Sequence, residues 1–189
     1  MEFVEPIKDP KKIQAMKTYL LGKNKRDYLL FVLGINSAVR INDLLQLTWG
    51  EVLKDNMKIR THIELKEDKT DKNKKFVIGK QLHKAIEIYM KELGEIDLED
   101  LIFKSRKKGY SLTRQQARRI IKEAAEMVGI EDRIGCHSLR KTFGYNAYTK
   151  GYDIAIIQKY LNHSSPSVTL RYIGIDQQQM DDMVLDLDL

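Results

Sequence analysis

Residues 161–172 read Leu-Asn-His-Ser-Ser-Pro-Ser-Val-Thr-Leu-Arg-Tyr, the most specific motif that we find in the chain. The motif places His163 nine residues before Tyr172. Ser165 followed by Pro166 is typical of the first residues of a helix. The motif therefore predicts a tight turn after His163 and a short helix through Tyr172.

Helical periodicity dominates the chain on the N-terminal side of this motif. Apolar residues recur at helical spacing, and Asp, Ser and Gly stand where helices begin and end. The pattern predicts helices at residues 10–21, 24–35, from about 42, 81–93, 113–128 and 138–150, one capped by Asp153, and a last one from Asp176.

Residues 57–79 depart from this pattern. Alternating residues at 58–65 and an apolar run at 76–78 flank a lysine-rich turn, which predicts a β-hairpin with a basic tip. The expected fold is mainly α with a small antiparallel β-sheet (α+β). A chain of 189 residues fits one domain, here 1–175, followed by an acidic tail or helix at 176–189.

Positive charge is concentrated in one part of the chain. The formal net charge is +6, although five aspartates lie in the last fourteen residues. Residues 101–122 contain no acidic side chain and many basic ones, a density suited to phosphate contacts. Double-stranded DNA is the expected partner, with contacts from Lys66, Lys72, Lys74, Lys75, Arg106, Lys107, Lys108, Arg114, Arg118 and Arg119. A solvated helix face is the competing interpretation, but such faces usually mix charges of both signs.

Two shorter patterns complete the candidate site. Arg40 precedes Ile-Asn-Asp-Leu-Leu-Gln-Leu-Thr-Trp at 41–49. His137 and Arg140 stand three residues apart near a helix start, so their side chains can point the same way toward an anion. Each pattern alone is common by chance, and Cys136 beside His137 is interpreted as a small core residue.

Together these motifs resemble, in order and spacing, the catalytic domain of the tyrosine recombinase or phage integrase family, a family found on mobile elements. Arg40, the His137 and Arg140 pair, the Leu-Asn-His segment ending at His163, and Tyr172 match the family motifs. The resemblance implies a catalytic lysine on the hairpin, for which Lys69 followed by Thr70 is the best match. Lys66, Lys72, Lys74 and Lys75 compete for that role.

Three residues depart from the family pattern. Ala38 replaces the usual glycine before Arg40, Asp43 replaces a glutamate, and Asn162 replaces the glycine before His163. None of the three removes a candidate catalytic group. Asn can adopt the left-handed backbone conformation that glycine supplies, whereas Ala38 could alter the turn that aims Arg40.

The resemblance implies a 3′-phosphotyrosyl intermediate. Arg40 and Arg140 would clamp the phosphate as fixed donors, with a further hydrogen bond from His163. The hydroxyl of Tyr172, whose pKa is ordinarily about 10, would lose its proton to His137. Lys69 would protonate the leaving oxygen.

No cofactor and no metal ion are expected. No apolar run approaches the roughly 20 residues of a membrane span, and the chain has no signal peptide, so we expect a cytoplasmic, nucleoid-associated protein without membrane contact. The resemblance implies a homo-oligomer, a tetramer on DNA, in which residues 176–189 contact a neighbouring subunit. As an alternative, the aspartates of this segment could shield the basic surface when no DNA is bound.

Three alternatives stay open at this stage. A DNA-binding regulator could keep the fold without cleaving, since residues 113–130 resemble a recognition helix. A type IB topoisomerase could use similar residues to nick and reseal one duplex. We expect the N-terminal core-binding domain of the family to be absent, which fits either an excised domain or a naturally short member such as the bacterial fimbrial inverting recombinases.

Overall fold

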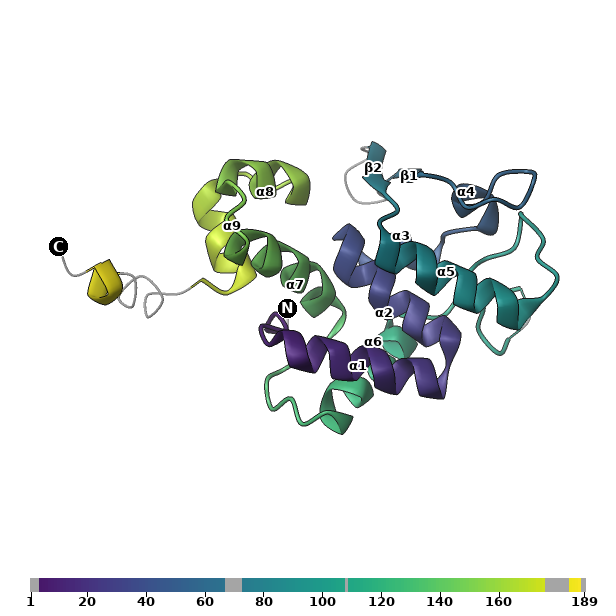
Figure 1. Ribbon diagram of the computed structural model, residues 1–189, viewed down its shortest axis with the longest axis horizontal. Coiled ribbons are helices and arrows are strands. Elements are labelled where there is room, and N and C mark those ends of the chain that lie inside the picture. The colour runs from purple at the N-terminus through teal and green to yellow at the C-terminus, as the bar shows by residue number, and fades with distance from the viewer. Residues whose placement is uncertain (1–3, 67–72, 108, 176–183, 188–189) are drawn as a thin grey trace.

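The computed structural model describes residues 4–66, 73–107, 109–175 and 184–187. Over these residues the chain is mostly helical with one two-stranded antiparallel sheet (Figure 1), which confirms the predicted fold class. The elements are α1 (Pro10–Lys23), α2 (Lys25–Ser37), α3 (Ile41–Leu45), α4 (Trp49–Val52), β1 (His62–Lys66), β2 (Asn73–Val77), α5 (Lys80–Leu93), α6 (Arg114–Met127), α7 (Cys136–Thr149), α8 (Ile154–Leu161) and α9 (Pro166–Ile173).

Local capping residues set the starts of the helices that the sequence predicted. The side chain of Asp9 accepts a hydrogen bond from the backbone N–H of Lys11 at 2.7 Å, at the start of α1. Asp153 and Ser165 cap α8 and α9 in the same way, through backbone donors at 2.6 and 3.2 Å. Each cap satisfies a donor that a helix start would leave without a partner.

The start of α7 and the short helix α4 differ from the prediction, and other helix ends shift by one or two residues. α7 begins at Cys136 rather than Ser138, because the backbone N–H of Gly135 donates to the Ser138 hydroxyl at 3.0 Å and closes the turn earlier. His137 therefore lies inside the first turn of α7. The short helix α4 was not predicted; Glu51 accepts a hydrogen bond from the backbone N–H of Thr48 at 2.7 Å and closes a capping box.

The hairpin also differs from its predicted limits. β1 begins only at His62, and β2 begins at Asn73, three residues before the predicted strand. Leu65 pairs with Lys74 and Glu64 with Lys75, so part of the expected lysine-rich turn is strand. The predicted final helix falls mostly on 176–183, outside the described residues, while 184–187 form one helical turn.

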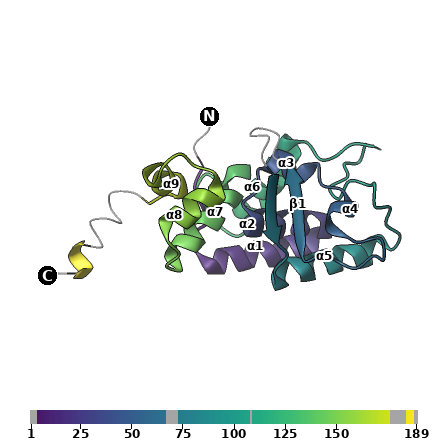
Figure 2. The ribbon, with the colours of Figure 1, turned by 90° about the horizontal axis from the view of Figure 1, so that it is seen from above.

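Two apolar clusters hold these elements together. The larger cluster includes buried residues of α1, α2, α5, α6 and the sheet, and Cys136 belongs to it as predicted. The smaller one comprises Ala38, Ile157, Leu161, Ile173 and Ile175, and partly buried residues of α7, α8 and α9 pack against it. Figures 1 and 2 show α8 and α9 grouped with α7 at one end of the molecule and the sheet with α4 toward the other.

A glycine lets α9 approach α7 closely. A Cβ atom built on Gly144 would lie 2.6 Å from Cγ2 of Ile173 and 3.1 Å from Cδ1 of Leu161. A side chain at this position would therefore push α9 away from α7. Since Ile173 directly follows Tyr172, this contact positions the tyrosine.

Candidate active site

Arg140 is the residue that joins the segments of the candidate site. Its side chain is buried, and its guanidinium donates to the carbonyl oxygen of Ala38 in the turn between α2 and α3, and to that of Leu161 at the end of α8. Both carbonyls end helices that are far apart in the sequence. The rigid fork of the arginine therefore fixes the relative position of α3, α7 and α8.

Two left-handed residues make these turns possible. Ala38 ends α2 with φ 52° and ψ 24°, and Asn162 ends α8 with φ 54° and ψ 47°. The prediction that Asn162 supplies the backbone conformation of the family glycine is confirmed. Ala38 adopts the same conformation, so its replacement of glycine preserves the turn that leads to Arg40 at the N-terminus of α3.

His163 and Tyr172 lie against each other. Their ring centroids are 4.7 Å apart and the rings meet edge to face at 73°. Burial, followed by the positive charges of Arg140 and Arg40, lowers the pKa of His163 to about 4. His163 is therefore a neutral ring at neutral pH, surrounded by fixed positive charge.

Tyr172 is held as a neutral phenol. Burial raises the pKa of its hydroxyl, and the charge of Arg140, a hydrogen bond from Arg140 and the charge of Arg40 oppose this rise. The Nζ of Lys141 lies 5.5 Å from the centre of the Tyr172 ring. The hydroxyl thus faces the same guanidinium that organises the site, and it needs a proton acceptor before it can act as a nucleophile.

His137 occupies the first turn of α7, next to α6. Its Nε2 lies 3.5 Å from Nη2 of Arg114. Burial, then the charges of Arg114, Arg140, Lys141 and Arg40, lower the pKa of His137. A neutral imidazole can accept a proton, which is the role that the sequence predicts for it.

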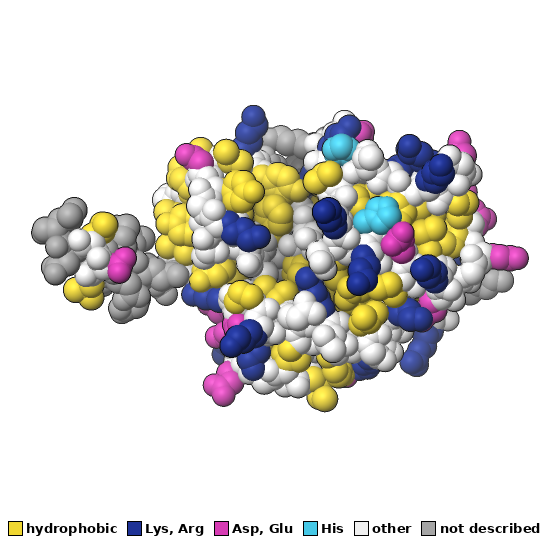
Figure 3. Space-filling model, in the orientation of Figure 1, with side chains coloured by type: hydrophobic (Ala, Val, Ile, Leu, Met, Phe, Trp, Pro, Cys, Tyr) yellow, Lys and Arg dark blue, Asp and Glu magenta, His cyan; other side chains and the backbone are white. Residues whose placement is uncertain are grey.

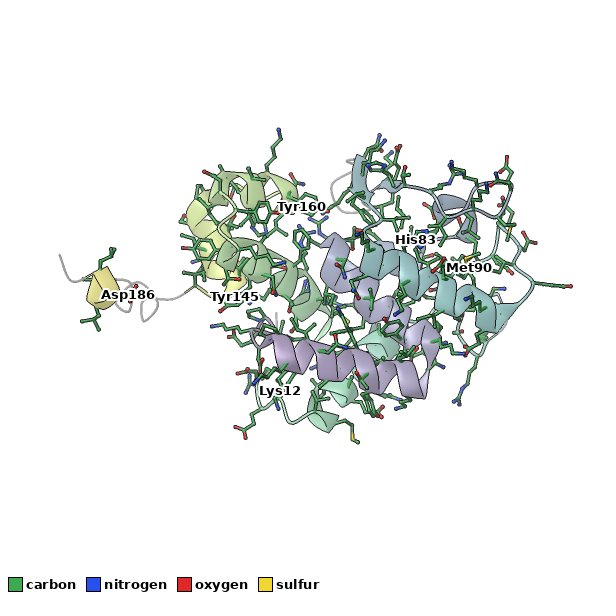
Figure 4. The ribbon with its side chains drawn as sticks, viewed as in Figure 1. Lys12, His83, Met90, Tyr145, Tyr160 and Asp186 are labelled. Atoms are coloured by element: carbon green, nitrogen blue, oxygen red, sulfur yellow. The ribbon has the colours of Figure 1, made fainter. Side chains whose placement is uncertain are left out.

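One hairpin lysine among the described residues reaches the site. Nζ of Lys74 on β2 lies 3.3 Å from the carbonyl oxygen of Tyr160 and 3.4 Å from that of Ala38, the carbonyl that Arg140 also contacts. It also lies 4.4 Å from the centre of the Tyr160 ring. Figure 4 places Tyr160 on the side of α8 that faces the hairpin and α2.

The other candidate lysines of the hairpin differ in position. Lys69 and Lys72 lie outside the described residues, as does Lys108. Lys75 is exposed and pairs with Glu64 across the hairpin at 2.6 Å. Lys66 lines an open cleft of about 720 Å³ together with Asn42, Thr113 and Arg114.

The basic residues of 101–122 are exposed where the structure describes them, and two of them lie next to His137. Arg114 and Arg118 of α6 line a pocket of about 270 Å³ with Gly135, Cys136 and His137. Arg106, Lys107 and Arg119 are also exposed. Figure 3 shows that Lys and Arg side chains on the face carrying α1 and α5 are scattered and interleaved with acidic ones.

Sequence reasoning missed two residues of this region. Lys141 is buried beside Tyr172, and Thr169 is fully buried with its hydroxyl 3.2 Å from Nδ1 of His163. The spacing of Thr169, three residues before Tyr172, could have indicated a position one helical turn away. Nothing local marks Lys141, whose burial depends on the packing of α7 against its neighbours.

No cluster of three His, Cys, Asp or Glu side chains in the described ranges could hold a metal ion. No helix within those same ranges is long and apolar enough to cross a membrane.

Comparison with known proteins identifies relatives of this chain. Residues 9–179 match the phage integrase family. The chain is 48% identical over 177 residues to the probable integrase/recombinase YoeC of Bacillus subtilis, covering 94% of this chain and 93% of YoeC. It is 30% identical to the type 1 fimbriae regulatory protein FimE of Escherichia coli, covering 86% and 82% of the two chains.

Solved structures share the fold. The chain superposes on XerA recombinase with a TM-score of 0.76 at 21% identity, covering 98% of this chain and 66% of XerA. It superposes on XerH bound to a palindromic difH substrate with a TM-score of 0.74 at 19% identity, covering 100% of this chain and 54% of XerH. The chain thus spans between about half and two thirds of these solved chains. From the family match, the identity to YoeC and the shared fold, we conclude that the chain belongs to the phage integrase family of tyrosine recombinases and has the fold of their catalytic domain.

Proposed function

We propose that this protein is a site-specific DNA recombinase that cuts and rejoins strands through a 3′-phosphotyrosyl intermediate, with Tyr172 as the nucleophile. The observation that carries the proposal is the hydrogen bond from Arg140 to the Tyr172 hydroxyl, beside His163 and within the field of Arg40. Arg140 thus contacts the candidate nucleophile with the same guanidinium that would bind the phosphate.

The charges around the site favour a bound phosphodiester. Both histidines have lowered pKa values, first because they are buried and then because the charges of Arg40 and Arg140 repel a further proton. An anion placed between these arginines would be attracted by the same charges. The fixed donors would then stabilise the additional charge of the transition state.

The proposed cleavage step moves two protons. The Tyr172 oxygen bonds to phosphorus while its proton passes to His137, and the bond from phosphorus to the 5′ oxygen breaks. Lys69 gives a proton to that oxygen, which leaves a free 5′-hydroxyl. Attack by a 5′-hydroxyl on the phosphotyrosine reverses the step and joins the strands without a cofactor. Lys74 is the alternative donor, because it already contacts the backbone of the site.

Covalent trapping tests this proposal. Wild-type and Tyr172→Phe protein are incubated with supercoiled and nicked DNA in EDTA, and adducts that survive detergent are measured. An adduct from the wild type alone supports the tyrosine nucleophile. An adduct that persists in Tyr172→Phe overturns the residue assignment, and tight binding without any adduct favours the non-cleaving regulator.

Analysis of the DNA products distinguishes strand exchange between two duplexes from nicking and resealing of one duplex. Exchange of strands between two duplexes that carry the target sequence supports recombination. Relaxation of a single supercoiled duplex without exchange would instead indicate a topoisomerase-like activity. XerH was solved on its difH substrate, which makes a short palindromic duplex a suitable design for the target.

We further propose that residues 1–175 form the catalytic domain and that residues 176–189 contact a neighbouring subunit in a tetramer on DNA. Val184, Leu185 and Leu187 are exposed in the helical turn at 184–187 and could bury apolar surface on a partner. Deletion after Ile175 should abolish oligomer formation on DNA, measured by light scattering. If the acidic segment instead shields the basic surface, the deletion will tighten non-specific DNA binding.

A further inference from the structure

Thr169 is a small polar residue that lies beside the ring of His163. It is fully buried in α9, one turn before Tyr172. Its Oγ1 lies 3.2 Å from Nδ1 of His163 and 3.1 Å from the carbonyl oxygen of Ser165. The hydroxyl therefore has two neighbours and only one hydrogen to donate.

This hydroxyl can donate its single hydrogen either to the carbonyl of Ser165 or to Nδ1 of His163. If the Thr169 hydroxyl donates to Ser165, its lone pair accepts the proton on Nδ1 of His163, and both short contacts are hydrogen bonds. If the hydroxyl donates to Nδ1 instead, the contact between two oxygens at 3.1 Å has no hydrogen. A helical threonine commonly donates to the carbonyl four residues earlier, which is the residue Ser165 here. The first arrangement makes one more hydrogen bond.

The backbone around His163 is fixed as well. The N–H of His163 donates to the carbonyl of Gln158 at 3.0 Å, and Nε2 of Gln158 donates to the carbonyl of His163 at 3.1 Å. The ring packs edge to face on Tyr172. Since both ends of the residue are held, the ring cannot exchange its two nitrogens without breaking the hydrogen bond with Thr169.

We infer that Thr169 is a positioning residue that keeps the proton of neutral His163 on Nδ1, so that Nε2 is the nitrogen that takes up a proton when a DNA phosphate binds. This inference rests on the proposed function and deepens it. The proton comes from solvent and adds to Nε2, and the ring then carries two N–H groups. Nδ1–H stays bonded to Thr169 while Nε2–H donates to a phosphate oxygen.

The surroundings of His163 explain why the proton arrives only with the substrate. The groups that face the ring are Arg140 from α7, Arg40 from the start of α3, and Tyr172 and Thr169 from α9. Burial first, and then the charges of both arginines, oppose protonation of the ring in the free protein. A bound phosphodiester offsets their charge, and the resulting bond from a charged donor is stronger than one from a neutral ring.

The first test measures directly which ring nitrogen of His163 is protonated, and it does not depend on DNA cleavage. Nitrogen-15 NMR of the full chain without DNA reports which ring nitrogen carries the proton, and His163→Gln identifies the signals of His163. We expect a protonated Nδ1 in the wild type and in Thr169→Ser, which keeps the hydroxyl. We expect the proton to move to Nε2 in Thr169→Val. A wild-type ring protonated on Nε2 overturns the inference, whether or not the valine variant folds.

The second test follows the rate of adduct formation on nicked DNA between pH 5 and pH 8. In the wild type and in Thr169→Ser, the rate should fall as the pH rises and Nε2 loses its proton. In Thr169→Val, the rate at neutral pH should be about tenfold lower and this pH dependence should flatten. Thr149→Val makes the same chemical change at an exposed residue of α7 and should behave as the wild type.

The two tests separate the inference from the proposed function. Identical pH profiles for wild type and Thr169→Val overturn the positioning role. If no variant forms an adduct but NMR places the proton on Nδ1 only when the hydroxyl is present, the proposed function fails and the tautomer assignment stands.

Discussion

The guanidinium of Arg140 donates to the carbonyl oxygen of Ala38, 102 residues earlier in the chain. The same guanidinium reaches Leu161 and the hydroxyl of Tyr172. One buried side chain therefore closes the turn before Arg40, holds the end of α8 before His163 and orients the candidate nucleophile. Stability and the geometry of the site are coupled through this residue.

Arg140→Lys should lower both stability and activity. Lysine keeps the positive charge, but it lacks the planar set of donors with which the guanidinium hydrogen-bonds two carbonyls and a phenol. A buried carbonyl left without a donor should reduce the free energy of unfolding by about 2 kcal/mol, measured by urea denaturation. Arg133→Lys makes the same replacement at an exposed site and should change stability little. Equal losses in the two variants would contradict the coupling.

Gly144→Ala should destabilise the protein and slow cleavage by Tyr172. The added methyl group meets Ile173 at 2.6 Å, so α9 must shift, at a cost of about 1–3 kcal/mol. Gly22→Ala in α1 is the matched control, because no atom beyond its chain neighbours and the adjoining helix backbone lies within 4 Å of its new Cβ. That variant should gain about 0.5–1 kcal/mol from the higher helix propensity of alanine. Thermal unfolding and adduct formation measure both effects, and a stabilised Gly144→Ala would contradict the close packing.

Acid should destabilise the folded state in the range where the histidines titrate. The pKa of His163 is lowered from 6.5 to about 4, so the unfolded chain accepts a proton that the folded chain resists. Its contribution to stability is present above pH 6.5 and is lost as the pH falls toward 4. His137 acts in the same direction.

His163→Gln isolates this contribution. Between pH 7 and pH 4.5 the variant should lose less stability than the wild type, by about 1 kcal/mol once solvent screening of a partly exposed ring is allowed for. Urea denaturation at several pH values measures the difference. Parallel losses in the two proteins would show that His163 has an ordinary pKa in the folded state.

Arg114 and Arg118 should contribute to DNA affinity by neutralising phosphates. Replacing both with glutamine should weaken binding to any duplex and reduce the slope of log affinity against log salt by about 0.9 for each phosphate that is no longer neutralised. Fluorescence anisotropy over a range of salt concentrations measures this slope. The control removes the same charge from Lys84 and Lys91, two exposed residues of α5. Figure 2 shows the helix α5 on the side of the molecule away from α3. Equal slopes for both double variants would indicate a diffuse charge effect instead.

Much of the fold follows from signals that lie within a few residues. Asp9, Asp153 and Ser165 cap three helices whose starts the sequence predicts. The order of Arg40, His137, Arg140, His163 and Tyr172 indicated the family, which the comparisons confirm. The roles of these residues, and of Lys69, stay predictions for the experiments above.

The sequence by itself determined where most helices begin, which family motifs are present and that Asn162 is able to adopt a left-handed conformation, because capping, periodicity and backbone preference act over a few neighbouring residues. Only the tertiary structure decided that Arg140 donates to Ala38 and Leu161, that Lys74 reaches the carbonyl of Tyr160, and that Thr169 contacts His163. These contacts depend on how packed helices and the hairpin place distant segments, and on which donors remain once the local hydrogen bonds are made.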